Sequence, residues 1–284
     1  MALGINGAML VAEAVGGVVT GSLAVLADAG HVLSDVGAIG LALFAASLAA
    51  RPAGGRMTFG YQRSEILAGL VNGLLLVVVA LAIAYAAIGR LGDPPEIDAG
   101  GVLGLGLLGL AGNVAATLIL ARGERADVNL EGVLRHSAAD ALGSIGVVIA
   151  GVVVLTGGSS IVDPIVSLAI SLLILISSWR LIKEPVDVLM EAAPAGVDVD
   201  AAGAAICSED GVRSVHDLHI WTVTSGFGAL AAHVVVSADC DSGLVRRRIE
   251  LLLRERFGID HTTLQMEDEA PTTLLHVENA PPQA

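Results

Sequence analysis

Charged side chains are scarce in this chain. Asp, Glu, Lys and Arg together make up 15% of its 284 residues, whereas an ordinary soluble domain carries about 25%. Hydrophobic residues make up 54%. Most of them lie before about residue 184, in runs near the ~20 residues that a helix needs to cross a bilayer. The shortage of charge therefore excludes a wholly soluble protein, and it predicts a membrane domain over residues 1–184 with a soluble domain behind it.

Cysteine is almost absent. The two cysteines, Cys207 and Cys240, both fall in the soluble part and form no C-x-x-C pair. Neither a disulfide framework nor a cysteine-based metal site is indicated, and we expect two isolated thiols.

No basic segment precedes the first apolar run, which starts at Ala2. A cleaved secretory signal would begin with such a segment. We therefore interpret the first run as a spanning helix. Its abrupt start leads us to expect that a short leader is missing from the sequence.

Basic residues are also few after residue 184. Residues 185–284 hold 6 Lys and Arg against 16 Asp and Glu, so they carry a net charge of -10 out of the -14 of the whole chain. Such an acidic domain argues against nucleic acid and against anionic lipid as its partners. The negative charge of this domain could attract cations, although most of its acidic residues are typical of a solvated surface.

Six apolar stretches approach the length of a membrane-spanning helix, so we expect a six-helix transmembrane bundle. They cover residues 3–22, 24–50, 64–90, 99–121, 130–156 and 160–182. Basic residues concentrate in alternate loops: Arg51, Arg56, Arg63, Arg122, Arg125, Arg180 and Lys183 lie on one side, and Arg90 alone lies on the other. By the positive-inside rule, both termini are then cytosolic.

After Pro185 the pattern becomes that of a small α+β domain, over residues 185–275, followed by a loose tail at 276–284. The expected order is α-β-β-α-β, with both helices on one face of the sheet. The elements are a helix at 198–208, strands at 214–223 and 229–237, a helix at 242–257 and a strand at 260–267. The apolar face of the second helix is expected to hold Leu244, Val245, Ile249, Leu252 and Leu253.

Two copies of the pattern H-x-x-x-D lie inside apolar stretches: His31 with Asp35, and His136 with Asp140. Residues four apart on a helix share a face. Two such helices that face each other would supply two nitrogen and two oxygen ligands, a tetrahedral His2Asp2 site that suits Zn²⁺, with Co²⁺, Fe²⁺ and Cd²⁺ as alternatives. The alternative without a metal is a pair of intrahelical His–Asp hydrogen bonds.

Metal and protons compete for such a site, because a bound metal needs neutral imidazoles and ionised carboxylates. Histidine titrates near pH ~6.5, so exchange of metal for protons is chemically accessible. Asp28 lies three residues before His31, on nearly the same helix face. We interpret it either as an outer-shell or proton partner of the site, or as a residue that caps the helix start.

The chain resembles the cation diffusion facilitator family of zinc transporters, of the bacterial zinc-efflux type. The resemblance covers nearly the whole chain and rests on several segments. They are residues 21–31 (GSLAVLADAGH), residues 134–144 (LRHSAADALGS), Asp163-Pro164, and residues 216–221 (HDLHIW). Residues 51–63, where the family often has a further histidine-rich site, hold no histidine, cysteine or acidic residue, so we expect that site to be absent.

The resemblance implies a secondary active transporter in the cell (inner) membrane. It would export Zn²⁺ from the cytosol in exchange for H⁺, by alternating access in a homodimer. The cytosolic domain would have a metallochaperone-like fold. Its metal positions would fall on His216, His233, His261 and Glu267, with Zn²⁺ as a regulatory ligand. Their alternative interpretation is a set of histidines on a solvated sheet face.

Strand alternation predicts that His216 and His219 lie on opposite faces, because their offset is odd. They would then not share one ion, and we favour His216 as the ligand.

An enzyme is not expected. An intramembrane metallohydrolase would need a general base beside the metal, as in H-E-x-x-H, and this motif is absent from the sequence. A non-transporting membrane zinc sensor is a further alternative, which tight zinc binding without flux would support.

Overall fold

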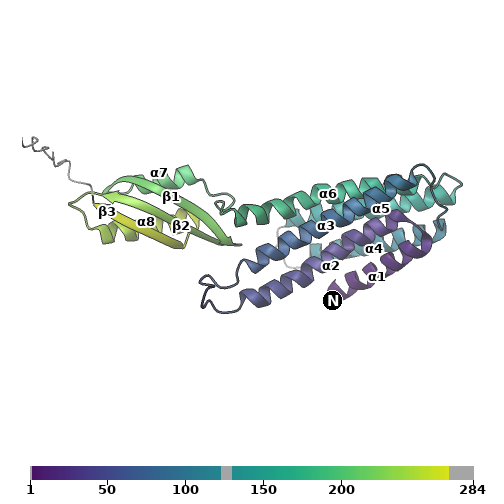
Figure 1. Cartoon of the computed structure of the whole chain (residues 1–284), viewed down its shortest axis with the longest axis horizontal. Coiled ribbons are helices and arrows are strands. Elements are labelled where there is room, and N and C mark those ends of the chain that lie inside the picture. Colours follow the sequence, from purple (N-terminus) through teal and green to yellow (C-terminus); the bar gives the residue numbers. More distant parts are fainter. Residues whose placement is uncertain (1, 123–129, 269–284) are drawn as a thin grey trace, which may run out of the picture. The chain divides into compact units, whose positions relative to one another are not determined.

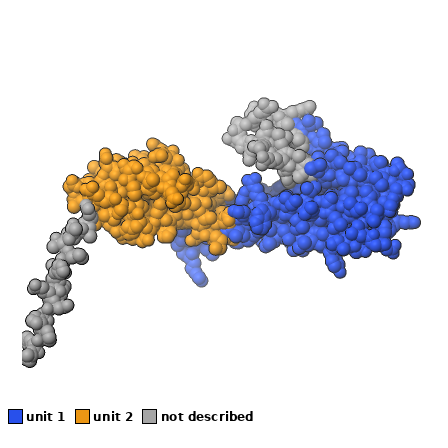
Figure 2. All heavy atoms as spheres, turned by 90° about the horizontal axis from the view of Figure 1, so that it is seen from above, with its two compact units in different colours: residues 1–186 blue, residues 187–284 orange. Residues whose placement is uncertain are grey.

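The computed structural model describes residues 2–122 and 130–268, except that the side chains of residues 130–139 and of some residues in 2–5 and 116–122 are not described. The predicted tail, 276–284, lies outside the described residues. By its contacts the chain divides into two compact units, a helical unit over Met1–Val186 and a sheet unit over Asp187–Ala284 (Figure 2).

The helical unit consists of long helices that run beside one another (Figure 1). They are α1 (Ala2–Thr20), α2 (Leu23–Ala49), α3 (Ser64–Arg90), α4 (Ala99–Arg122), α5 (Leu130–Leu155) and α6 (Val162–Leu189). Among the described residues, α2, α3 and α6 are each long and apolar enough to cross a membrane. Shorter apolar stretches lie in α1, α4 and α5, at Asn6–Thr20, Ala99–Ala115 and Asp140–Leu155. A helical membrane part is confirmed, while the count of six spans remains a prediction.

Helix α6 is longer than its predicted range of 160–182, because it continues through Pro185 to Leu189. A proline inside a helix removes one backbone hydrogen bond and costs about 3 kcal/mol. Here Pro185 is buried, and its Cγ lies 3.6 Å from the position that a Cβ on Gly69 of α3 would occupy. Packing of the ring against this small residue offsets part of that cost.

The start of α2 is held by α6. Gly21 adopts a positive φ of 73°, which reverses the chain after α1. Ser22 is the N-cap, accepts a hydrogen bond from the Val25 amide, and donates its hydroxyl hydrogen to Asp163. The Asp163 carboxylate also accepts hydrogen bonds from the amides of Leu23 (2.9 Å) and Ala24 (3.3 Å). A buried acidic side chain of α6 thereby satisfies the free amides at the start of α2.

Helices α4 and α5 pack closely against each other at glycine residues. A Cβ on Gly106 would lie 2.9 Å from the backbone nitrogen of Val148, and one on Gly151 would lie 2.7 Å from that of Leu103. Such distances leave room only for hydrogen, as is common between membrane helices. The shared core nearby includes Val102 and Val147, both almost fully buried.

The sheet unit has the predicted α-β-β-α-β order. Its elements are α7 (Val199–Cys207), β1 (Val212–Thr224), β2 (Phe227–Val236), α8 (Ser242–Phe257) and β3 (His261–Asp268). The strand order is β1-β2-β3, with β1 antiparallel and β3 parallel to β2 (Figure 1). The central strand β2 and its neighbour β3 are joined through α8, which forms a βαβ unit.

Both helices of the sheet unit pack on one sheet face, as predicted. The core comprises alternate residues of β2 together with one stripe of each helix. Its fully or almost fully buried members include Ala202, Ile206, Leu230, Ala232, Val234, Val236, Val245, Ile249 and Leu253. Leu244 was expected on the same helix face but is 57% exposed. It lies in the first turn of α8, rotated by about 100° from the stripe of Val245, Ile249 and Leu253.

Strand β1 carries a bulge that changes which residues share a face. His216 pairs with His233, but His219 pairs with Ala231. The strand β1 therefore advances by three residues where β2 advances by two, so β1 holds one extra residue here. Asp217, within the bulge, has a φ of 49°, a conformation that Asp tolerates better than most residues. The prediction of opposite faces for His216 and His219 is therefore wrong: both lie on the face away from the helices.

Candidate metal centres

Three side chains predicted as metal ligands converge in the helical unit. His31 and Asp35 come from α2 and Asp140 comes from α5, and one ligand atom of each lies within 4.8 Å of those of the others. Nε2 of His31 is 2.6 Å from Oδ1 of Asp140. A hydrogen bond between these two atoms requires one proton, held either by the imidazole nitrogen or by the carboxylate oxygen.

The orientation of α2 follows from local contacts. His31 and Asp35 are one turn apart and therefore point to the same side, toward α5. On α2, Ser34 accepts a hydrogen bond from Nδ2 of the buried Asn72 of α3, at 3.1 Å. An interhelical hydrogen bond of this kind fixes the rotation of α2 against α3. The fourth predicted ligand, His136, lies in α5 one turn before Asp140, but its side chain is outside the described part.

One turn from this cluster lies a second polar layer, which includes Asp28. Asp28 is buried, and its Oδ2 accepts a hydrogen bond from the Ser144 hydroxyl of α5 at 3.1 Å. Ser144 in turn accepts one from Nδ2 of Asn113 of α4 at 3.2 Å. Because Ser22 is the N-cap of α2, the alternative that Asp28 caps the helix is wrong. The layer also contains Glu13 of α1, which is buried.

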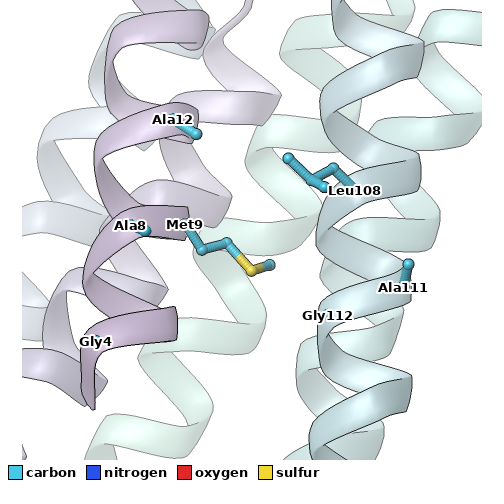
Figure 3. Close-up of a pocket in the computed structure, with 7 residues that line it drawn as sticks. All are labelled: Gly4, Ala8, Met9, Ala12, Leu108, Ala111 and Gly112. Carbon is cyan, nitrogen blue, oxygen red and sulfur yellow. The ribbon is translucent and has the colours of Figure 1, made fainter. Parts of the chain in front are cut away.

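A hollow of about 640 Å³ lies between α1 and α4, lined by Gly4, Ala8, Met9, Ala12, Leu108, Ala111 and Gly112 (Figure 3). Its walls are glycine and apolar side chains, which offer a divalent cation no side-chain ligand. The Met9 side chain reaches from α1 toward α4 at one edge of the hollow (Figure 3). The hollow is therefore an apolar depression rather than a metal site.

A second cluster lies in the sheet unit and contains His216, His233 and Glu267. Nε2 of His216 is 3.0 Å from Oε2 of Glu267, and Nδ1 of His233 is 2.7 Å from Oε1 of the same carboxylate. The two imidazole rings lie 5.0 Å apart, centre to centre. The hydrogen bond from His233, followed by that from His216, lowers the pKa of the Glu267 carboxyl below its ordinary value.

The strand register explains this second cluster. His216 and His233 are direct partners in the β1–β2 ladder, and Glu267 pairs with Val235, two residues beyond His233 on the same face. That face is opposite to the helices. Two imidazole nitrogens and one carboxylate are a ligand set suited to zinc.

His261 does not join this cluster. It lies on the same face of β3, but six residues before Glu267, a separation of about 20 Å along a strand. Its ring contacts that of Phe227 edge-on, with the centres 5.6 Å apart. Within one protomer, His261 therefore cannot bind the same ion as Glu267.

Comparisons with known proteins cover both units. Residues 1–190 match the model of the cation efflux transmembrane domain, and residues 194–269 match that of the cation efflux protein cytoplasmic domain. The chain is 41% identical over 271 residues to the cadmium, cobalt and zinc/H(+)-K(+) antiporter of Bacillus velezensis, an alignment that covers 94% of this chain and 86% of that protein. It is 37% identical over 268 residues to the zinc transporter ZitB of Escherichia coli, across 94% of this chain and 85% of that protein.

Among solved structures, the metal-bound C-terminal domain of the CzcD transporter from Cupriavidus metallidurans is 38% identical, covers 25% of this chain and 99% of its own, and has a TM-score of 0.24. The two matching domains account for almost all of the described residues. The chain belongs to the cation efflux family of membrane transporters, also called cation diffusion facilitators.

Proposed function

We propose that this protein exports Zn²⁺ from the cytosol in exchange for H⁺, and that His31, Asp35, His136 and Asp140 bind the transported ion. The observation that carries the proposal is the convergence of His31, Asp35 and Asp140 from two neighbouring helices of the membrane part. Ionisable side chains at membrane depth are costly unless they serve one another or a ligand. His136 would add the fourth ligand, since it is one turn from Asp140 on α5.

Exchange of metal for protons follows from the chemistry of this cluster. Without metal, Nε2 of His31 and Oδ1 of Asp140 share a hydrogen bond, so a proton lies between these two ligand atoms. A zinc ion needs the lone pair of that same nitrogen, so the proton must leave before the metal binds. Protons that arrive from outside would restore the hydrogen bond and expel the metal. Alternating access of the site to the two sides of the membrane would turn this competition into antiport.

The ion itself is proposed from the donor set. Two imidazoles and two carboxylates in a four-ligand site suit Zn²⁺, and the same set accepts Co²⁺, Fe²⁺ or Cd²⁺. The name of the Bacillus velezensis relative includes cadmium and cobalt beside zinc. Transport of these ions by the same site is the second candidate function.

We further propose six spans with both termini on the cytosolic side of the cell (inner) membrane. The apolar stretches of α1, α4 and α5 support the three spans beyond α2, α3 and α6. The loop charges support the orientation. A homodimer is proposed because residues 194–269 match the cytoplasmic domain of the family.

In the sheet unit, His216, His233 and Glu267 are proposed to bind a regulatory zinc ion. Three protein ligands leave one position of a tetrahedral ion for water or for a group from a second copy of the chain. Such an ion would hold the cytoplasmic domains of the two protomers together when cytosolic zinc is high.

Zinc flux into proteoliposomes with an imposed pH gradient tests the membrane site. The parent should show proton-driven flux, and His31→Ala and Asp140→Ala should each lower it by roughly tenfold or more, since either change removes a ligand and its coordination geometry. His219→Ala, which removes an exposed histidine outside both clusters, is the matched control. Flux in either site variant equal to that of the parent would overturn the site assignment, and tight zinc binding by the parent without flux would indicate a sensor.

A further inference from the structure

Glu13 of α1 is a buried carboxylate with no hydrogen-bond partner among the described residues. It is 2% exposed, and neither of its oxygens is hydrogen-bonded to any described group. An isolated buried carboxylate is stable only if it is protonated or if it meets a ligand. Glu13 is therefore expected to hold a proton or to bind a ligand.

The Glu13 carboxylate points into a gap left by a glycine of α4. Oε1 of Glu13 is 3.0 Å, and Oγ of Ser144 is 3.2 Å, from the position that a Cβ on Gly109 would occupy. The two oxygens are therefore no more than about 6 Å apart, a span that one bridging water can cover. On its other side, Ser144 donates a hydrogen bond to Asp28. Glu13 and Asp28 thus lie at the two ends of one short polar path.

This path is adjacent to the proposed metal site. Asp28 precedes His31 by three residues on α2, and Ser144 follows Asp140 by four residues on α5. Both offsets correspond to about one helical turn, or roughly 5 Å along the axis. The layer with Glu13, Ser144 and Asp28 therefore lies next to the layer with His31 and Asp140.

The path is closed toward the α1–α4 hollow. The Met9 Cε atom lies 3.4 Å from the same Gly109 Cβ position, and its Sδ lies 2.8 Å from the corresponding position of Gly112. This thioether separates Glu13 from the hollow. The polar groups that lead away from Glu13 are therefore Ser144 and Asp28, on the side of the metal site.

Charge is unbalanced in this layer. The ionisable groups that face it among the described side chains are Glu13, Asp28, His31 and Asp140, and no described Lys or Arg forms an ion pair with either Glu13 or Asp28. Two ionised carboxylates so close together repel each other and lose their hydration. A divalent cation one turn away would remove much of this penalty.

We propose that Glu13 and Asp28 share one proton when the metal site is free, and that binding of the metal expels this proton. The O–H bond of the protonated carboxyl breaks, its electron pair stays on the carboxylate, and the proton passes to water. The pair changes from one negative charge to two as the divalent ion arrives. This inference rests on the proposed function, and it adds a coupled proton that the four metal ligands do not carry.

Calorimetry of zinc binding tests the proposal on the full chain in detergent at pH 7. Titrations in buffers of different ionisation enthalpy give the number of protons released per zinc ion. Glu13→Gln keeps the shape but cannot ionise, so it should release about one proton fewer than the parent. Asp28→Asn should cause the same loss, and Glu13→Asp should restore the parent number. Ser171→Ala, a buried serine of α6 outside this layer, is the control that should match the parent.

The outcomes separate this inference from the proposed function. A parent that binds no zinc, or releases no protons, would contradict the proposed function. If the parent binds zinc with proton release and both Glu13→Gln and Asp28→Asn release as many protons as the parent, only the shared proton is overturned. If Glu13→Gln abolishes zinc binding and Glu13→Asp does not restore it, Glu13 has a purely structural role and the proposal is also overturned.

Discussion

Nε2 of His31 and Oδ1 of Asp140 lie 2.6 Å apart between α2 and α5. Two ligands on one tetrahedral zinc ion, each about 2.1 Å from the metal, are roughly 3.4 Å apart. The direct hydrogen bond and joint coordination of zinc are therefore mutually exclusive arrangements of the same two atoms. The change between them requires a movement of less than about 1 Å, which side-chain rotation or a small helix shift can provide.

Removal of the Asp163 carboxylate should destabilise the helical unit. Asp163 is 1% exposed and accepts hydrogen bonds from the Ser22 hydroxyl and the amides of Leu23 and Ala24. Asp163→Ala leaves these buried donors unsatisfied, at about 1–3 kcal/mol each before relaxation. We expect a clear fall in the midpoint of thermal unfolding in detergent.

The control for Asp163 is Asp93→Ala, which makes the same replacement at an exposed position between α3 and α4. It should leave the midpoint within error of the parent, because exposed substitutions are usually near neutral. Equal midpoints for Asp163→Ala and the parent would show that the cap on α2 contributes nothing.

Two leucines of α8 provide a matched test of the sheet-unit core. Leu253 is fully buried, whereas Leu244 is 57% exposed. Leu253→Ala should lower the free energy of opening of α8 and β2 by about 2–5 kcal/mol, because it leaves a cavity. Leu244→Ala should change it by less than about 0.5 kcal/mol. Hydrogen–deuterium exchange of the full chain measures both values, and similar effects of the two substitutions would contradict the core assignment.

The sequence predicted the elements of the sheet unit closely, because period-2 and period-3.6 patterns report directly on burial. It could not predict the bulge at Asp217, since the shift depends on how β1 pairs with β2 and not on β1 alone. It also missed the continuation of α6 through Pro185. The local preference of proline is to end a helix, and it is overcome here by tertiary packing against Gly69.

In the candidate sites, too, local spacing could be predicted from the sequence, whereas contacts between elements could not. The i, i+4 spacing was enough to predict that His31 and Asp35 share a helix face. The isolation of Glu13 was not visible in the sequence, because it depends on which oxygens and glycines of α4 and α5 surround that carboxylate. Likewise, only the strand register shows that Glu267 lies beside His233 while His261 lies far along the same strand.

Glu267→Gln should weaken zinc binding by the sheet unit. The substitution replaces the carboxylate that contacts both His216 and His233 with a neutral amide, a much poorer zinc ligand. In a His31→Ala background, which removes a ligand of the proposed membrane site, competition with a chromophoric chelator should show an affinity loss of about tenfold or more. Asp268→Asn, the same change of charge at the next residue, is the control. Equal losses in both variants would indicate a general charge effect.

The contacts of Glu267 should also make the metal-free sheet unit sensitive to acid. The folded-state pKa of this carboxyl lies below its ordinary value of 4.5, so its contacts favour the ionised form. The stabilisation that these contacts give to the folded state is fully present above the ordinary pKa. It is lost as the pH falls through the lowered folded-state pKa. In exchange measurements on β3, Glu267→Gln should reduce protection at pH 7, and the difference from the parent should vanish in strong acid. A difference that grows below pH 4.5 would contradict this sign.

The most direct test of the membrane site is anomalous diffraction at the zinc edge, on crystals of the full chain grown with zinc. We predict a peak between α2 and α5, within about 2.0–2.2 Å of ligand atoms from His31, Asp35, His136 and Asp140. The distance between Nε2 of His31 and Oδ1 of Asp140 should then be roughly 3.4 Å. A zinc peak at His216, His233 and Glu267 with none between α2 and α5, or an intact His31–Asp140 hydrogen bond beside a bound ion, would contradict the assignment of the transport site.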